Sequence, residues 1–91
     1  RLYKIPIDNI CYFEAYGDYV KVHTTDSMYT VKNRLSSYDI LTKSQFVRTH
    51  RSYLINLDKI EFVEGNFVVM KNGKKLPVGK NNRKAFKGFI G

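Results

Sequence analysis

Apolar and polar residues alternate along several short stretches of this chain, and residues that favour turns separate the stretches. The clearest is 19–24, whose period of two predicts a half-buried strand with His23 on the solvated face. Similar patterns predict further strands over residues 2–7, 10–15, 28–31, 46–49, 53–55, 60–64, 67–71 and 74–78. Because these strands are short and joined by turns, we expect antiparallel pairing.

Two pairs of turn-forming residues predict hairpins in the second half of the chain. Gly65-Asn66 separates two apolar runs, and Asn72-Gly73 is the strongest hairpin signal in the sequence. The second pair predicts that 67–71 and 74–78 are joined by a two-residue turn.

Two helices are predicted from capping residues and helical spacing. Ser36 can act as the N-cap of a short central helix, with Leu35 and Ile40 placed to form a hydrophobic staple. A terminal helix is expected over 81–90, although Gly88 lowers its helical propensity. The whole pattern predicts a mainly β (α+β) domain with one short central helix and a C-terminal helix.

The length of 91 residues and the 43% hydrophobic content suit a single domain spanning 1–91. Cys11 is the only cysteine, so no internal disulfide can form, and a reducing, cytoplasmic location is expected. Cys11 lies in an apolar run and is predicted to be an unreactive core residue. No apolar run reaches the ~18–20 residues of a membrane helix. Because the chain opens within a strand-like pattern, we expect the domain to belong to a longer protein.

Positive charge dominates the composition and is unevenly distributed. The net charge is +8, and residues 65–91 contain seven of the sixteen basic residues and none of the eight acidic ones. Such segregation favours a polyanionic partner, above all nucleic acid. A solvated basic face that only aids solubility is the plainer alternative.

The sequence offers little to an enzyme. His23 and His50 are the only histidines, and no cluster of His, Cys and Asp has the spacing of a metal site. Neither a glycine-rich phosphate loop nor a nucleophile elbow is present. Ser52 could pair with His50, but no acid nearby would orient the imidazole. We therefore expect no catalytic residues, no metal and no cofactor.

Three polar segments at predicted strand ends are candidates for contact with nucleic acid, because their side chains can hydrogen-bond phosphates and base edges. The candidate residues are Asp18 and Tyr19 in the first segment, His50, Arg51 and Ser52 in the second, and Lys80, Asn81 and Arg83 in the third. Each segment also has a purely structural explanation. These are an ordinary turn at Gly17, backbone bonding by His50 or Ser52, and a solvated start of the terminal helix.

Five segments occur in an order that is typical of one family. They are 10–15, 17–22, 46–56, 57–60 and 76–80, and the most specific is 46–56, which contains His50-Arg51-Ser52 and ends in Asn56. Through these segments and the short central helix, nearly the whole chain resembles the LytTR domain, the DNA-binding module of bacterial response regulators.

The resemblance implies an elongated domain of small antiparallel β-sheets whose loops, and not a recognition helix, enter successive major grooves of double-stranded DNA. The family's DNA-facing positions correspond to the same three segments, around Asp18, Arg51 and Lys80. The resemblance further implies the cytoplasmic output domain of a two-component transcription regulator. We expect the parent protein to bind repeated sites as a homodimer without involving a membrane, and the isolated domain to be a monomer.

The chain departs from the family pattern at two places. Family members often carry Ser-Arg where this chain has Gly79-Lys80, and lysine lacks the planar fork with which arginine reads guanine. Asp18 repels phosphate and accepts hydrogen bonds, which suits a cytosine amino group. The alternative function is a β module that binds single-stranded nucleic acid or protein through exposed Tyr and Phe side chains.

Overall fold

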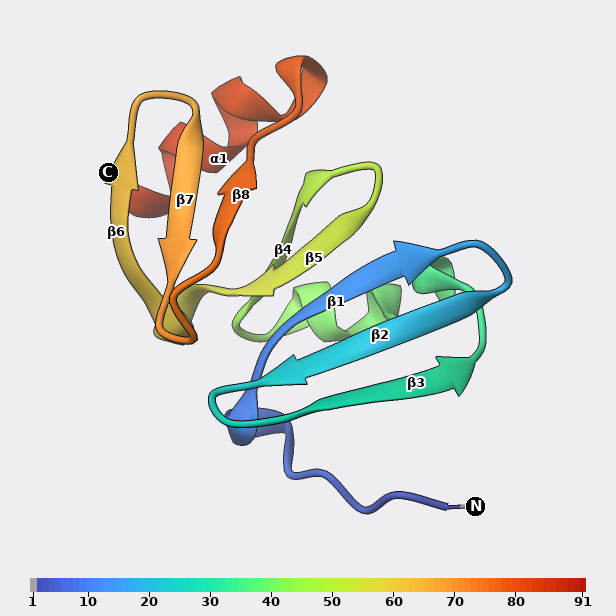
Figure 1. Ribbon diagram of the computed structural model, residues 1–91. Coiled ribbons are helices and arrows are strands. Elements are labelled where there is room, and N and C mark those ends of the chain that lie inside the picture. Colours follow the sequence, from blue (N-terminus) through green and yellow to red (C-terminus); the bar gives the residue numbers. More distant parts are fainter. Residues whose placement is uncertain (1) are drawn as a thin grey trace.

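Two antiparallel β-sheets pack against each other and against helices in the computed structural model, which describes residues 2–91 (Figure 1). The larger sheet has the order β3-β2-β1-β5-β4 and consists of β1 (Ile10–Tyr16), β2 (Tyr19–Thr24), β3 (Met28–Lys32), β4 (Phe46–His50) and β5 (Tyr53–Asn56). The smaller sheet consists of β6 (Ile60–Glu64), β7 (Phe67–Met70) and β8 (Lys75–Pro77), in that order. The helices are the 3-10 helices η1 (Ile7–Asn9), η2 (Leu35–Lys43), η3 (Leu57–Lys59) and η4 (Lys80–Asn82), and the α-helix α1 (Arg83–Ile90). The predicted mainly β fold with a C-terminal helix is confirmed.

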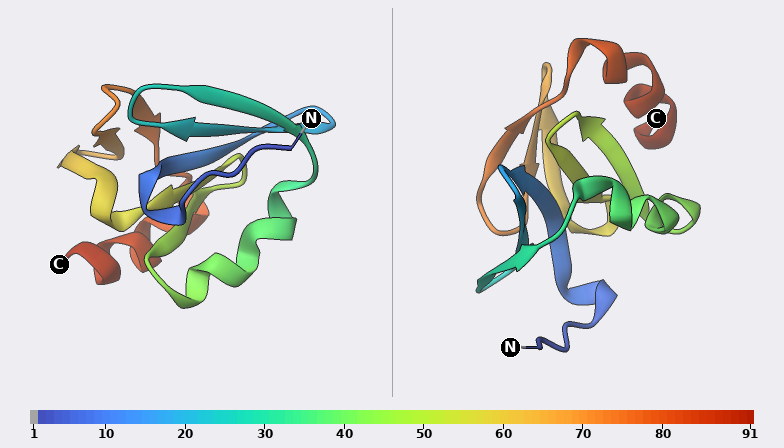
Figure 2. Two further views of the ribbon diagram at one scale, coloured as in Figure 1. Left: turned by 90° about the horizontal axis from the view of Figure 1, so that it is seen from below. Right: turned by 90° about the vertical axis from the view of Figure 1, so that its right-hand side faces the viewer.

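Strands β1, β4 and β5 of the larger sheet are buried on both faces because they lie between two cores (Figure 2). Successive residues of a strand point to opposite faces. Phe46 and Leu54 accordingly pack with η2, while Val47 and Ile55 pack with the smaller sheet and with Phe86 of α1. Burial on both faces explains why some strands of this sheet are continuous apolar runs in the sequence, while others alternate. Cys11 is fully buried in the second of these cores, as predicted.

Glycines set the hairpin turns. Gly17 and Gly65 have φ angles of 59° and 57°, values that side-chain-bearing residues rarely adopt. The Asn72-Gly73 loop is one residue longer than predicted. Gly73 (φ 88°) donates to the Met70 carbonyl at 2.8 Å, and Met70 donates to the Lys74 carbonyl at 2.9 Å. This is the three-residue hairpin loop, in which a left-handed glycine follows a type I turn.

The strand predicted over residues 2–7 is wrong. Residues 2–6 pair with no strand of the described chain, and Ile7 begins η1 instead. Pro6 has no N–H to give to a ladder, and the Tyr3 ring packs on that of Tyr29 at 4.8 Å. The alternation therefore does not reflect sheet pairing, and Leu2 is 99% exposed.

The predicted capping of the central helix is also wrong. Ser36 lies inside η2, and Asn33 organises the helix start by accepting hydrogen bonds from the Arg34 N–H (2.9 Å) and from Ser37 Oγ (2.7 Å). Ile40 is 66% exposed, so the staple with Leu35 does not form. A 3-10 helix turns more tightly than the α-helix for which the spacing was read.

The terminal helix begins later than predicted, at Arg83, because Lys80–Asn82 form the 3-10 turn η4. Of its apolar residues Phe86 is buried, whereas Phe89 and Ile90 remain 59% and 42% exposed. The helix therefore attaches to the core mainly through one aromatic side chain.

His23 is not on a solvated face as predicted. Its side chain is 14% exposed, its Nε2 lies 2.8 Å from Glu14 Oε1, and its ring stacks on Tyr12 at 4.2 Å. Glu14 is a neighbour because β1 and β2 pair antiparallel, with Tyr12 opposite His23. The sequence pattern could not reveal this aromatic and acidic surrounding.

Alkaline pH is expected to destabilise the domain through Tyr12, which is 2% exposed. Burial raises the Tyr12 pKa to about 12. An unfolded tyrosine ionises near pH 10, so stability is complete below that pH and declines between pH 10 and 12. We expect a loss on the order of 1–2 kcal/mol. Urea unfolding of the native chain and of Tyr12→Phe at pH 10 and pH 12 checks this. The free energy of unfolding should fall less in Tyr12→Phe than in the native chain, whereas the matched change at the exposed Tyr19, Tyr19→Phe, should leave the fall unaltered.

Candidate nucleic-acid interface

Three turns that are distant in the sequence follow one another along one edge of the molecule (Figure 1). The first turn joins β1 to β2, the second joins β4 to β5, and the third leads from β8 into η4. The right-hand view of Figure 2 looks at this edge and shows the same succession. The three predicted segments therefore lie on a common side of the domain.

The second turn is tied to the strand that ends in the first turn. β1 pairs with β5, with Phe13 opposite Leu54 and Glu14 opposite Tyr53. Beyond that ladder, the Ala15 N–H donates to the Ser52 carbonyl at 2.9 Å. Because these bonds join main-chain atoms, the spacing of the first two turns is a property of the sheet.

The third turn is tied to β4. The Gly79 N–H donates to the Thr49 carbonyl at 2.7 Å, and Asn82 Nδ2 donates to the Arg48 carbonyl at 3.3 Å. A Cβ on Gly79 would lie 3.0 Å from Asn82 Oδ1 and 3.5 Å from the Cα and Cδ2 of His50. A side chain at this position would therefore require the Asn82 amide to shift, whereas its contact with His50 would be an ordinary van der Waals one.

Asp18 and Tyr19 are exposed in the first turn. Asp18 lines a hollow together with Lys32, Asn33 and Arg34, so two basic residues stand beside the acidic one. Lys32 lies opposite Tyr19 in the pairing of β2 with β3. The predicted segment therefore includes a basic neighbour, contributed by the end of β3, that sequence reasoning missed.

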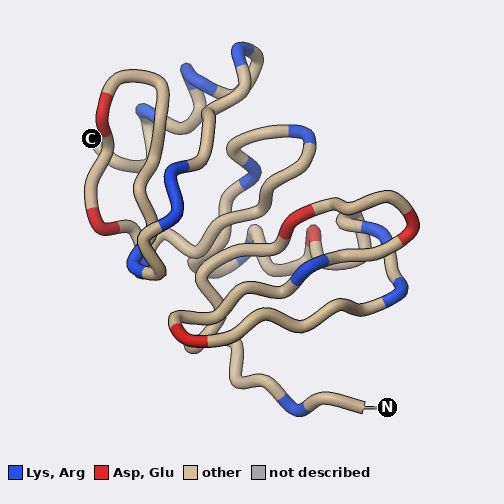
Figure 3. The backbone as a smooth tube through the Cα atoms, viewed as in Figure 1, with Lys and Arg blue, Asp and Glu red and all other residues tan. Residues whose placement is uncertain are grey.

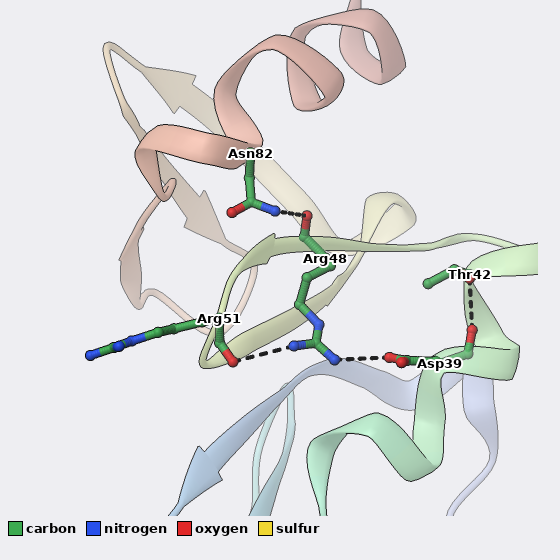
Figure 4. A network of polar contacts seen from close by, with 5 residues as sticks. All are labelled: Asp39, Thr42, Arg48, Arg51 and Asn82. Carbon is green, nitrogen blue, oxygen red and sulfur yellow. Dashed lines mark hydrogen bonds and ion pairs between the residues drawn. The ribbon is translucent and has the colours of Figure 1, made fainter.

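His50 and Arg51 have different roles in the second turn. The Ser52 N–H donates to His50 Nδ1 at 3.0 Å, so the proton of the neutral imidazole resides on Nε2. His50 thus bonds local backbone, which is the structural role predicted from the sequence as the alternative to contact with nucleic acid. Its Nε2–H remains a donor. Arg51 is exposed, and Figure 4 shows its side chain extending away from the neighbouring contacts.

Lys80 and Asn81 are exposed in the third turn, whereas Arg83 is half-buried. Arg83 Nε donates to the Val78 carbonyl at 3.3 Å. Part of the Arg83 guanidinium is therefore engaged within the protein, and Lys80 is the more available cation of the two.

The family model of the LytTr DNA-binding domain matches residues 1–91 of the chain. The chain belongs to this family. It is 32% identical to the transcriptional regulatory protein LytR of Staphylococcus aureus (strain N315), with the whole chain aligned to 39% of that protein. It is 33% identical to the sensory transduction protein LytT of Bacillus subtilis (strain 168), over 90% of this chain and 36% of that one. A solved LytTr DNA-binding domain from Bacillus cereus superposes with a TM-score of 0.86 at 26% identity, covering 96% of this chain and 85% of that one.

The matched family consists of DNA-binding domains of transcriptional regulators and is not a family of enzymes. The chain spans about 39% of the length of the LytR proteins that it matches. Across residues 2–91, no group of three or more His, Cys, Asp or Glu side chains is arranged to hold a metal ion. No helix in this range is long and apolar enough to cross a bilayer.

Basic residues lie at each of the three turns of the LytTr domain, and further ones lie on β8 and the C-terminal helix (Figure 3). Basic residues occupy the second and third turns, and the acidic residue at the first turn has basic residues beside it. β6, which carries the exposed Glu61 and Glu64, lies at the opposite edge (Figure 1), and Glu64 is paired there with Lys75 at 3.4 Å. The basic residues at the three turns suit contact with a polyanion.

Proposed function

We propose that this LytTr domain binds double-stranded DNA in a sequence-specific manner as the output domain of a bacterial transcriptional response regulator. The observation that carries the proposal is the hydrogen bonding between the three turns, through the Ser52 and Thr49 carbonyls and the Asn82 amide. Turns whose spacing is set before binding lose less conformational entropy when they meet DNA. The basic character of the same edge supplies the attraction.

We infer that the turns enter successive major grooves on one face of the duplex. The longest dimension of the domain is 39 Å, and one helical repeat of DNA is about 34–36 Å. A major groove about 12 Å wide admits a two-stranded β-ribbon, and each of the first two turns closes such a ribbon. The length of the domain is therefore close to one helical repeat of DNA.

The proposed roles follow from exposure and chemistry. Phosphate contacts would come from cations at the three turns, namely Lys32, Arg34, Arg51, Lys80 and Lys84, with a smaller part for Arg83. Base edges would be read by Asp18, Tyr19, Arg51 and Asn81, while His50 Nε2–H and the Ser52 hydroxyl offer single hydrogen bonds. Lys32 and Arg34 would offset the repulsion between Asp18 and the backbone of DNA.

The remainder of the parent protein would supply signal input and dimerisation. The matched regulators are more than twice as long as this chain, since it aligns with 39% of LytR. We propose that a homodimeric parent acts in the cytoplasm on paired sites. The isolated domain would then sediment as a monomer without DNA.

A gel-shift competition tests the function. A duplex selected from a random library should compete far better than a scrambled duplex or either single strand. If about five phosphates are neutralised, log affinity should fall with log salt at a slope of roughly −4 to −5. Preference for single strands would contradict the proposal and favour a stacking module built on the exposed Tyr16 and Tyr19.

A further inference from the structure

Arg48 holds its guanidinium between η2 and the second turn (Figure 4). Its Nη2 lies 2.8 Å from Oδ1 of Asp39 on η2, and its Nη1 donates to the main-chain carbonyl of Arg51 at 3.3 Å. The Arg48 side chain is 30% exposed and the Asp39 side chain 56%. Arg48 therefore directs its terminal nitrogens to protein atoms, whereas Arg51 extends outward.

The peptide unit between Arg51 and Ser52 is held at both of its polar groups. Arg48 Nη1 bonds its C=O, and His50 Nδ1 accepts from its N–H at 3.0 Å. Because a peptide unit is planar, fixing both groups fixes its orientation. That orientation helps set the direction in which the Arg51 side chain leaves the main chain.

The main chain at Arg48 is also joined to the third turn. Its carbonyl accepts from Asn82 Nδ2 at 3.3 Å, and the next carbonyl, that of Thr49, accepts from the Gly79 N–H at 2.7 Å. Through its side chain and its main chain, Arg48 thus connects η2, the second turn and the third turn.

We propose that Arg48, oriented by Asp39, is a positioning residue that holds the Arg51–Ser52 peptide and sets the direction in which Arg51 enters the DNA. The inference rests on the proposed duplex-binding function. In it, Arg48 contributes to recognition through Arg51 and not through a DNA contact of its own.

Charge and positioning predict opposite effects for Asp39. Removing its carboxylate makes the domain more positive, which by electrostatics alone strengthens DNA binding. Loss of positioning weakens it. An ion pair this exposed contributes little to stability, so neither effect should be obscured by unfolding.

The test compares Asp39→Ala with Asp26→Ala, which removes the same charge from the exposed β2–β3 turn. Binding to the selected duplex should weaken about threefold to tenfold in Asp39→Ala and stay equal or become tighter in Asp26→Ala. Arg48→Lys keeps the charge but has one terminal nitrogen in place of the two that bond Asp39 and Arg51, so it should lose binding as Asp39→Ala does. Melting temperatures should change by less than about 4 °C.

A double-mutant cycle identifies the residue through which Asp39 acts. In an Arg51→Ala background, Asp39→Ala should change affinity by less than about twofold, because the side chain that it positions is absent. An equal fold loss in both backgrounds, or unweakened binding by Asp39→Ala alone, would overturn the inference. A wild-type domain that fails to distinguish the selected from the scrambled duplex would instead overturn the proposed function itself.

Discussion

Replacing Arg51 or Lys80 with alanine is expected to weaken binding to a selected duplex by at least ~1 kcal/mol, or about fivefold. Both residues are exposed, one at the tip of the second turn and one at the start of η4. Arg51 can donate two parallel hydrogen bonds to guanine or to a phosphate, and Lys80 offers a point charge. The nearest other cation at the second turn, Arg48, is already paired with Asp39, so it should not replace Arg51.

Anisotropy titrations at several salt concentrations would measure both the loss and its origin. A phosphate contact should lower affinity for all duplexes and reduce the salt slope by about 1, whereas a base contact should lower the preference for the selected site. Lys74→Ala is the charge-matched control, because Lys74 is exposed in the β7–β8 loop, away from the three turns. His23→Ala should also bind normally. Unchanged binding in both Arg51→Ala and Lys80→Ala, or an equal loss in Lys74→Ala, would contradict the three-turn interface.

Sequence periodicity predicted an element correctly where the pattern arises from burial of one face of that element. The 19–24 stretch alternates because β2 has one face in a core, and Gly65-Asn66 forms the hairpin that its residue types favour. The 2–7 stretch alternates equally well but forms no strand, because alternation does not reveal whether a partner strand exists. Ser36 failed as a cap because Asn33, outside the predicted helix, bonds the helix start instead.

The sequence nominated the three candidate segments, but it did not reveal how they are organised in space. Charge and turn chemistry identified three segments, yet nothing local in the sequence indicates that Gly79 bonds to Thr49. Arg48 went unnoticed for the same reason: its partners Asp39 and Asn82 are 9 and 34 residues away. Contacts of that separation depend on tertiary packing, which composition and periodicity do not encode.

Replacing Asn56 with alanine is expected to destabilise the domain by about 2–4 kcal/mol. Asn56 is fully buried at the end of β5, and its amide makes two hydrogen bonds. Nδ2 donates to the Ile10 carbonyl at 2.9 Å, and Oδ1 accepts from the Asp58 N–H at 2.9 Å. One side chain therefore joins the start of β1 to η3, the link between the two sheets.

The size of the effect follows from what alanine leaves behind. The buried Ile10 carbonyl would lose its partner, which costs about 1–3 kcal/mol, and the part-buried Asp58 N–H would lose its partner as well. A domain of this size has a total stability of about 5–14 kcal/mol, so the loss should be visible as a lower urea midpoint with an unchanged slope. Asn81→Ala, at an exposed position of η4, is the matched control and should change stability by less than about 0.5 kcal/mol. A loss below about 1 kcal/mol in Asn56→Ala would mean that water or a shifted main chain can bond the Ile10 carbonyl and the Asp58 N–H. The connection between the sheets would then not depend on the Asn56 amide.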